Sequence, residues 1–217
     1  MPGPTPTAPR SDGAGRRTLV IACGALAREI VDMIRLNGWT HLAVTCLPAI
    51  WHNTPARIPE AVRAKIRAAR GDYDSILVAY GDCGTGGQLG AVLAEEGVSR
   101  IEGPHCYAFY RGVAEFMREA EDDPTCFYLT DYLVRHFERL IVQGLGLDRH
   151  PELLADYFGN YTKLVYLAQT ENQEMAARAR QAAARLGLAY EYRLTGYGQL
   201  AGFLNESNEA GDASWHG

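Results

Sequence analysis

An α/β fold with an open, mostly parallel sheet is the fold class that the sequence predicts. Several candidate strands are continuous apolar runs, such as residues 18–23 and 163–168, and such runs are typical of strands buried on both faces of a parallel sheet. Segments with the apolar period of a helix alternate with these runs, as in right-handed βαβ units. The predicted architecture is therefore Rossmann-like, with three layers and helices on both faces of the sheet.

Seven runs that are rich in β-branched and aromatic residues are the predicted strands. They lie at residues 18–23, 41–47, 75–80, 100–103, 125–129, 163–168 and 188–194.

The segments between the strands carry helix signals. Residues 26–34 have one apolar stripe, which Asn37 and Gly38 close as a stop signal. A second stripe covers 133–141, with Asp131 placed to cap it, and an Ala- and Arg-rich helix over 172–186 ends at Gly187.

The domain organisation follows from composition. Residues 1–16 and 205–217 are rich in small and polar residues, which predicts disordered tails, and residues 17–204 form the single predicted α/β domain. The first residues contain no apolar segment of the kind that secretory signals carry, and we expect a cytoplasmic protein with reduced thiols.

Composition also excludes some function classes. The net charge of −5 argues against a nucleic-acid partner, because nucleic-acid proteins usually present a basic face. No run of about 18 apolar residues occurs, so we expect no membrane span. The five cysteines are an odd number with no CxxC pair, which does not suit a disulfide scaffold.

Three cysteines follow predicted strands, where open α/β sheets bind ligands. Cys23 ends the first strand, Cys83 and Cys106 follow the third and fourth, and His52 follows the second. His105 directly precedes Cys106. Three thiolates and one imidazole are a tetrahedral ligand set for zinc, whereas three thiolates alone could hold an iron–sulfur cluster. A nucleophilic pair of Cys83 or Cys106 with either histidine, without metal, is also open. Cys46 and Cys126 lie inside predicted strands and are expected in the core.

The segment Gly81-Asp82-Cys83-Gly84-Thr85-Gly86-Gly87 follows a strand and precedes a helix. Gly84, Gly86 and Gly87 are candidates for binding an anion through backbone N–H groups, and the helix dipole is expected to lower the pKa of the Cys83 thiol. A tight turn that needs glycine only for its backbone angles is the alternative. The spacing is not GxGxxG, which disfavours a dinucleotide cofactor.

Charged side chains follow the fifth predicted strand. Asp131 and Arg135 are four residues apart and could pair on one helix face. A solvated helix would explain both residues without a function. However, Asp131 directly follows a strand, at the same predicted sheet edge as the cysteines, so it is a candidate acid, base or partner of a metal ligand.

These segments together resemble a bacterial and archaeal family, domain of unknown function 1638 (DUF1638). The resemblance rests on CGAL at Cys23, LPAIWHNTP around His52, YGDCGTGG at Cys83, GPHCYAFY at Cys106 and further segments up to TGYGQL at residues 195–200. It implies that the shared Cys and His positions are Cys23, His52, Cys83, His105 and Cys106. It also suggests a one-carbon context with a corrinoid or methyltransferase partner protein.

The function expected from the sequence is that of a metal-dependent enzyme acting on a small polar or anionic molecule. Cys23, Cys83, Cys106 and His52 would hold the metal, with His105 as the alternative fourth ligand. Asp131, Arg135 and His105 would act on the substrate. The alternatives are a metal or cluster carrier without catalysis, and a metal-free enzyme with a cysteine nucleophile.

Overall fold

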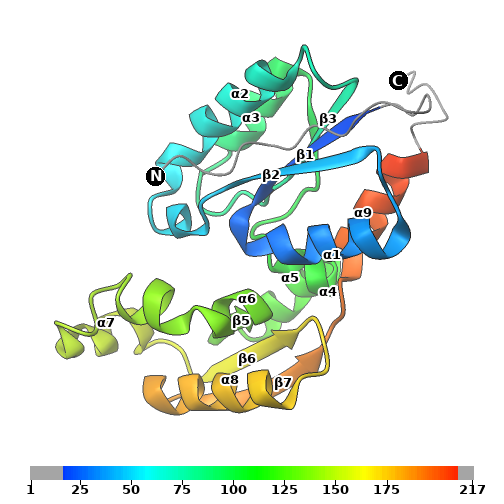
Figure 1. Cartoon of the computed structure of the whole chain (residues 1–217). Helices are drawn as coiled ribbons and strands as arrows, with labels where there is room; N and C mark the ends of the chain where they lie inside the picture. The colour runs from blue at the N-terminus through cyan, green and yellow to red at the C-terminus, as the bar shows by residue number, and fades with distance from the viewer. Residues whose placement is uncertain (1–16, 210–217) are drawn as a thin grey trace. The chain divides into compact units, whose positions relative to one another are not determined.

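The computed structural model describes residues 17–209, and within them the predicted α/β class with parallel sheets is confirmed (Figure 1). The described chain divides into two compact units. One contains the residues up to Cys106 and those from Leu200 onward, and the other contains Tyr107–Gln199.

The first unit contains a parallel sheet with the strand order β2-β1-β3-β4. Its elements are β1 (Thr18–Cys23), α1 (Ala27–Asn37), β2 (Leu42–Leu47), α2 (Ile58–Ala69), β3 (Ser75–Ala79), α3 (Gln88–Glu96), β4 (Ser99–Arg100) and α9 (Gly198–Glu209), of which α9 joins this unit from Leu200. In Figure 1, α2 and α3 lie over one face of this sheet and α1 lies over the other. All six residues of β1 are buried, as expected for a strand covered on both faces.

The strand order places a switch point between β1 and β3. The chain passes from β1 to β2 on one side, and then crosses to β3 on the other side of β1. Loops that leave neighbouring strands in opposite directions open a crevice beyond the carboxyl ends of the strands, where open α/β sheets bind ligands. Cys23 is the last residue of β1, and Cys83 lies in the loop that follows β3.

The second unit contains a parallel sheet with the order β5-β6-β7. Its elements are α4 (Ala108–Arg111), α5 (Val113–Asp122), β5 (Cys126–Thr130), α6 (Asp131–Arg135), a π-helical turn (Glu138–Val142), α7 (Leu154–Phe158), β6 (Lys163–Ala168), α8 (Gln173–Leu186) and β7 (Ala189–Leu194).

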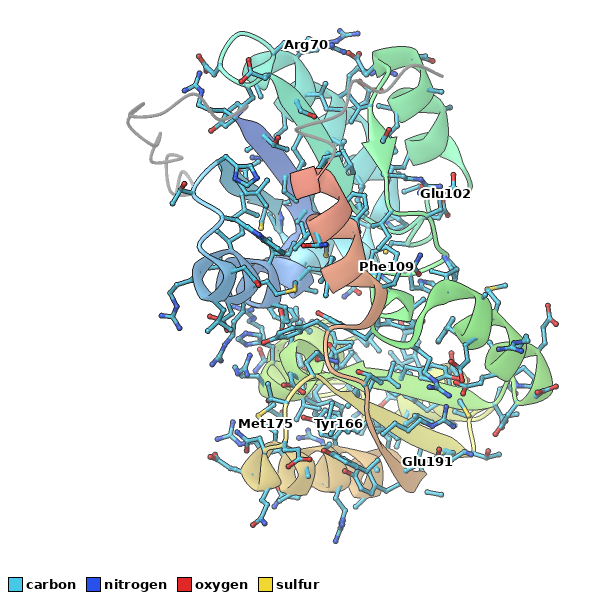
Figure 2. The ribbon with its side chains drawn as sticks, turned by 90° about the vertical axis from the view of Figure 1, so that its right-hand side faces the viewer. Arg70, Glu102, Phe109, Tyr166, Met175 and Glu191 are labelled. Atoms are coloured by element: carbon cyan, nitrogen blue, oxygen red, sulfur yellow. The ribbon has the colours of Figure 1, made fainter. Side chains whose placement is uncertain are left out.

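Alternate residues of β5 and β6 enter two different cores. Leu129, Tyr166 and Ala168 pack in one core with residues of α6 and α8, and Figure 2 shows Tyr166 and Met175 of this core. Tyr128 and Val165, which point to the opposite face, pack in another core with Phe116 of α5. Helices therefore cover both faces of this sheet, which explains why its strands are apolar throughout.

Predicted helix ends agree with the structure. Gly38 and Gly187 end α1 and α8 with φ angles of 67° and 71°, in the left-handed region that favours glycine. The Asn172 side chain caps α8 by accepting a hydrogen bond from the Met175 backbone N–H at 3.0 Å.

Other predictions need correction. The strands form two sheets in two units, and not the single sheet of a single domain over 17–204. Thr130, and not Asp131, caps α6, because its hydroxyl accepts a hydrogen bond from Leu133 N–H. The predicted tail at 205–217 begins too early, since α9 continues to Glu209. Residues 1–16 and 210–217 lie outside the described residues.

Among residues 17–209, no helix combines the length and apolar character that crossing a membrane requires.

Candidate functional site

Three buried thiols meet beyond the carboxyl ends of the strands of the first unit. The Cys83 and Cys106 sulfurs are 3.4 Å apart, and Cys106 also forms a hydrogen bond with Cys23. Each of the three residues is less than a tenth exposed, and all are free thiols. These three residues, which we call the thiol cluster, are 60 and 23 positions apart along the chain.

Close backbone contact brings the loops together. The N–H groups of Asp82 and Cys83 donate to the carbonyls of Gly103 and Pro104, both at 2.8 Å, so the chain after β3 runs against the segment that precedes Cys106. A Cβ atom at Gly81 would lie 2.7 Å from the His105 carbonyl carbon. Only glycine permits this approach, because backbone atoms cannot move aside as a flexible side chain can.

The cluster shares protons among its sulfurs. Hydrogen bonds with Cys23 and Cys83, together with burial, raise the pKa of Cys106 well above its usual value, so Cys106 keeps its proton. A hydrogen bond with Cys106 is also the largest cause of the lowered pKa of Cys23 and of the lowered pKa of Cys83. Backbone N–H groups support the sulfurs, since Gly81 N–H donates to Cys106 and Ala25 N–H to Cys23, at 3.4 and 3.5 Å.

Two imidazoles adjoin Cys83. His105 and His52 both form hydrogen bonds with its sulfur, which adds to the lowering of the Cys83 pKa. The two rings lie 5.9 Å apart between centroids, and the pKa of His52 is raised chiefly by its bond to Cys83. His52 is exposed, so one side of the site is open to solvent.

Tyr80 is a further member of the site that the sequence analysis missed. It is the residue after β3, it is 1% exposed, and it forms a hydrogen bond with Cys23. Burial and the nearby sulfurs raise its pKa, which keeps the phenol protonated as a donor. Its position next to Gly81 at a strand end was the signal that could have identified it.

Cys83 has a strained backbone. Its φ of 48° is the one positive value of a non-glycine residue in the described part of the chain. A residue in this region costs about 1–3 kcal/mol and persists where the surrounding structure imposes it. Here the hydrogen bond to Pro104 and the contacts of the sulfur impose it.

The glycine-rich loop binds the chain's own carboxylate. Where the sequence suggests a cradle for an anion, Gly86 and Gly87 N–H donate to Asp82 at 3.0 and 2.9 Å, and the Thr85 hydroxyl donates to it at 2.6 Å. Burial raises the pKa of the Asp82 carboxyl, but these bonds outweigh it and hold the pKa below its usual value. Gly84, Gly86 and Gly87 all have positive φ, which favours the turn interpretation. Hydrogen bonds with Cys106, His105 and His52 lower the Cys83 pKa, and α3 begins at Gln88, five residues after Cys83.

Asp131 and Arg135 belong to the second unit, and their sheet is not the one that precedes the cysteines. The buried Asp131 carboxylate does not pair with Arg135. It accepts hydrogen bonds from Tyr166 Oη at 2.6 Å, from Thr170 Oγ1 at 3.0 Å and from Gln169 N–H at 3.1 Å. Asp131 therefore joins the ends of β5 and β6.

The two other cysteines lie in strands, as expected, but only Cys126 lies in a core, and Cys46 is half-buried. Cys126 is buried in a core of the second unit. Cys46 lies in β2, where burial raises the pKa of its thiol to about 11.

No metal ion fits between these donors as they stand. Among residues 17–209, no three His, Cys, Asp or Glu side chains form a group that could hold an ion. In the thiol cluster the sulfurs contact one another directly, at a separation of 3.4 Å for Cys83 and Cys106. Two sulfurs on one zinc ion lie roughly 3.7 Å apart, given a Zn–S bond of about 2.3 Å and tetrahedral angles.

Comparisons with known proteins place the chain in a family. No curated protein matches the sequence. A solved structure that resembles this one is "ornithine carbamoyltransferase from Pyrococcus furiosus", at 16% identity and a TM-score of 0.28, over 82% of this chain. The match spans 54% of that enzyme's chain. Residues 46–204 match the family described as "Protein of unknown function (DUF1638)", and this chain therefore belongs to the DUF1638 family.

Proposed function

We propose that the thiol cluster and His52 form a site for a soft metal ion, with zinc as the first candidate and an iron–sulfur cluster as the alternative. The observation that carries the proposal is the contact of Cys106 with both Cys23 and Cys83 at the carboxyl ends of parallel strands. Sulfur and imidazole are the donors that zinc prefers in proteins.

Metal binding would replace the shared protons of the cluster. Thiols must lose their protons to bind a metal ion, so an ion and a network of S–H···S bonds exclude each other. To bind one zinc ion, the Cys83 and Cys106 sulfurs, which are 3.4 Å apart, would need to separate by only a few tenths of an ångström. His52 already contacts Cys83 and would supply the fourth donor.

A catalytic role would follow from access to the site. His52 is exposed, and the switch-point crevice is the place where open α/β sheets bind small molecules. In an enzyme, the metal would act as a Lewis acid on a small polar or anionic substrate, with His105 beside it.

The five free thiols of the chain support a reducing compartment such as the cytoplasm.

The first experiment is metal analysis of the full chain purified without oxygen. We expect about one zinc ion per chain. We also expect the metal-depleted protein to take zinc from a chromogenic chelator when total zinc is micromolar or lower. A brown sample that contains iron and sulfide would favour the cluster instead. The proposal would be contradicted if the purified protein contained neither zinc nor iron and also failed to take micromolar zinc from the chelator.

The second candidate is a metal-free enzyme with Cys83 as nucleophile, and the observation that favours it is the strained backbone of Cys83 beside two imidazoles. Because the Cys83 pKa is lowered, we expect its alkylation rate in metal-depleted protein to change little between pH 8 and pH 6. The control is Cys46, whose pKa is raised to about 11 and whose rate should fall about tenfold per pH unit. Mass spectrometry after iodoacetamide pulses measures both rates in one sample. Parallel pH profiles for the two thiols would exclude this candidate.

A further inference from the structure

A cavity of about 480 Å³ lies within the second unit. None of the residues that line it belongs to the proposed metal site. It is lined by residues of α6, the π-helical turn and α8. Its volume falls in the range of about 300–1,000 Å³ that is typical of small-molecule sites.

Four arginines line this cavity because of helix periodicity. Arg178 and Arg185 are seven residues apart on one face of α8, and Arg135 and Arg139 are four residues apart along the segment from α6 into the π-helical turn. In that turn the Gln143 N–H donates to the Glu138 carbonyl at 2.8 Å, five residues back. Such turns interrupt α-helices rarely and occur frequently at functional sites.

The charges of the cavity are only partly balanced. Arg178 pairs with Glu174 at 2.7 Å, and Arg185 pairs with Glu138. Within residues 17–209, neither Arg135 nor Arg139 takes part in an ion pair. Glu138 also lines the cavity but is paired with Arg185, so Arg135 and Arg139 face the cavity without a carboxylate partner, in a chain whose net charge is −5.

The two arginines also affect the pKa of the neighbouring His136 side chain. Its pKa is lowered by burial first, and then by the charges of Arg139 and Arg135. The imidazole stays neutral at pH 7 and can either donate or accept a hydrogen bond. Val134, Phe137 and Ala182, which also line the cavity, are buried apolar residues.

We propose that this cavity binds a small organic anion that carries at least one phosphate group. Guanidinium groups bind phosphate oxygens with two parallel hydrogen bonds, and one phosphate brings enough negative charge to balance both Arg135 and Arg139. A single carboxylate would leave one of the two unbalanced. The apolar surface suits the carbon skeleton of such a molecule. This site lies outside the proposed metal site and does not depend on it.

The test is calorimetric titration of the full chain with inorganic pyrophosphate at low ionic strength. We expect saturable binding, and we expect the double variant Arg135→Gln/Arg139→Gln to bind at least about tenfold more weakly, since charge-assisted bonds are lost. The matched control is Arg28→Gln/Arg118→Gln, which removes the same charge from two exposed arginines outside the cavity. This control should retain wild-type affinity.

Three results would overturn the proposal. One is no detectable binding of pyrophosphate by the wild-type protein at millimolar concentration. Another is equal weakening in the two double variants, which would show attraction to overall charge. The third is tighter binding of citrate than of pyrophosphate, which would assign the cavity to carboxylates. Circular dichroism spectra that match the wild-type spectrum would exclude unfolding of the variants. The zinc content of each variant is measured separately, so that failure of this proposal can be told apart from failure of the metal proposal.

Discussion

Replacing Cys106 by serine is expected to weaken zinc binding by about 100-fold or more. Zinc sites of this kind contribute roughly 10–16 kcal/mol from four ligands, or about 3 kcal/mol for each, and about 1.4 kcal/mol is a factor of ten. Cys106 is the ligand whose loss should matter most, because it contacts both other sulfurs of the thiol cluster. The measurement is competition for zinc against a chromogenic chelator, with the full chain kept reduced.

Cys46→Ser is the matched control for this variant. Cys46 lies in β2 of the same sheet and undergoes the same chemical change, but the sulfurs that form hydrogen bonds with Cys106 are those of Cys23 and Cys83. We expect Cys46→Ser to bind zinc as the wild-type protein does. If Cys106→Ser kept the wild-type affinity, or if both variants lost it equally, the thiol cluster would not be the zinc site.

Replacing Asp131 by alanine is expected to destabilise the second unit by about 3 kcal/mol or more. The change leaves the Tyr166 hydroxyl, the Thr170 hydroxyl and the Gln169 N–H without their acceptor. An unsatisfied buried donor costs about 1–3 kcal/mol, and the cost is higher where the lost acceptor was charged. The ends of β5 and β6 would lose the group that joins them.

Hydrogen exchange is the suitable measurement, because Trp39 and Trp51 both lie in the first unit and their fluorescence would report on the wrong unit. We expect amides of β5 and β6 to exchange about 100-fold faster in Asp131→Ala, with β1 and β3 unchanged. Asp156→Ala, an exposed change on α7, is the control and should have an effect within about 0.5 kcal/mol. Unchanged protection of β5 and β6 in Asp131→Ala would contradict the proposed role of the carboxylate.

Local signals were sufficient to predict most elements of this chain. The apolar run 163–168 is β6, and the helix that ends at Gly187 is α8, with Asn172 at its start. These features depend on the period of apolar residues and on backbone angles near each residue, so the segment itself contains the information. Membership of a sheet does not, because strand pairing depends on residues far away in the chain. The strands after Cys106 therefore follow the predicted pattern but form a second sheet.

The candidate site divides in the same way. That Cys23, Cys83 and Cys106 follow strands of one parallel sheet could be inferred from the sequence, since the carboxyl ends of such strands share an edge. Only the tertiary structure decided that Cys106 contacts both other sulfurs, that Tyr80 joins them, and that Asp82 occupies the glycine loop. It also decided that Asp131 binds Tyr166 and not Arg135. The physical reason is that a buried polar group takes the partners that the packed core places around it, and sequence spacing alone does not contain those partners.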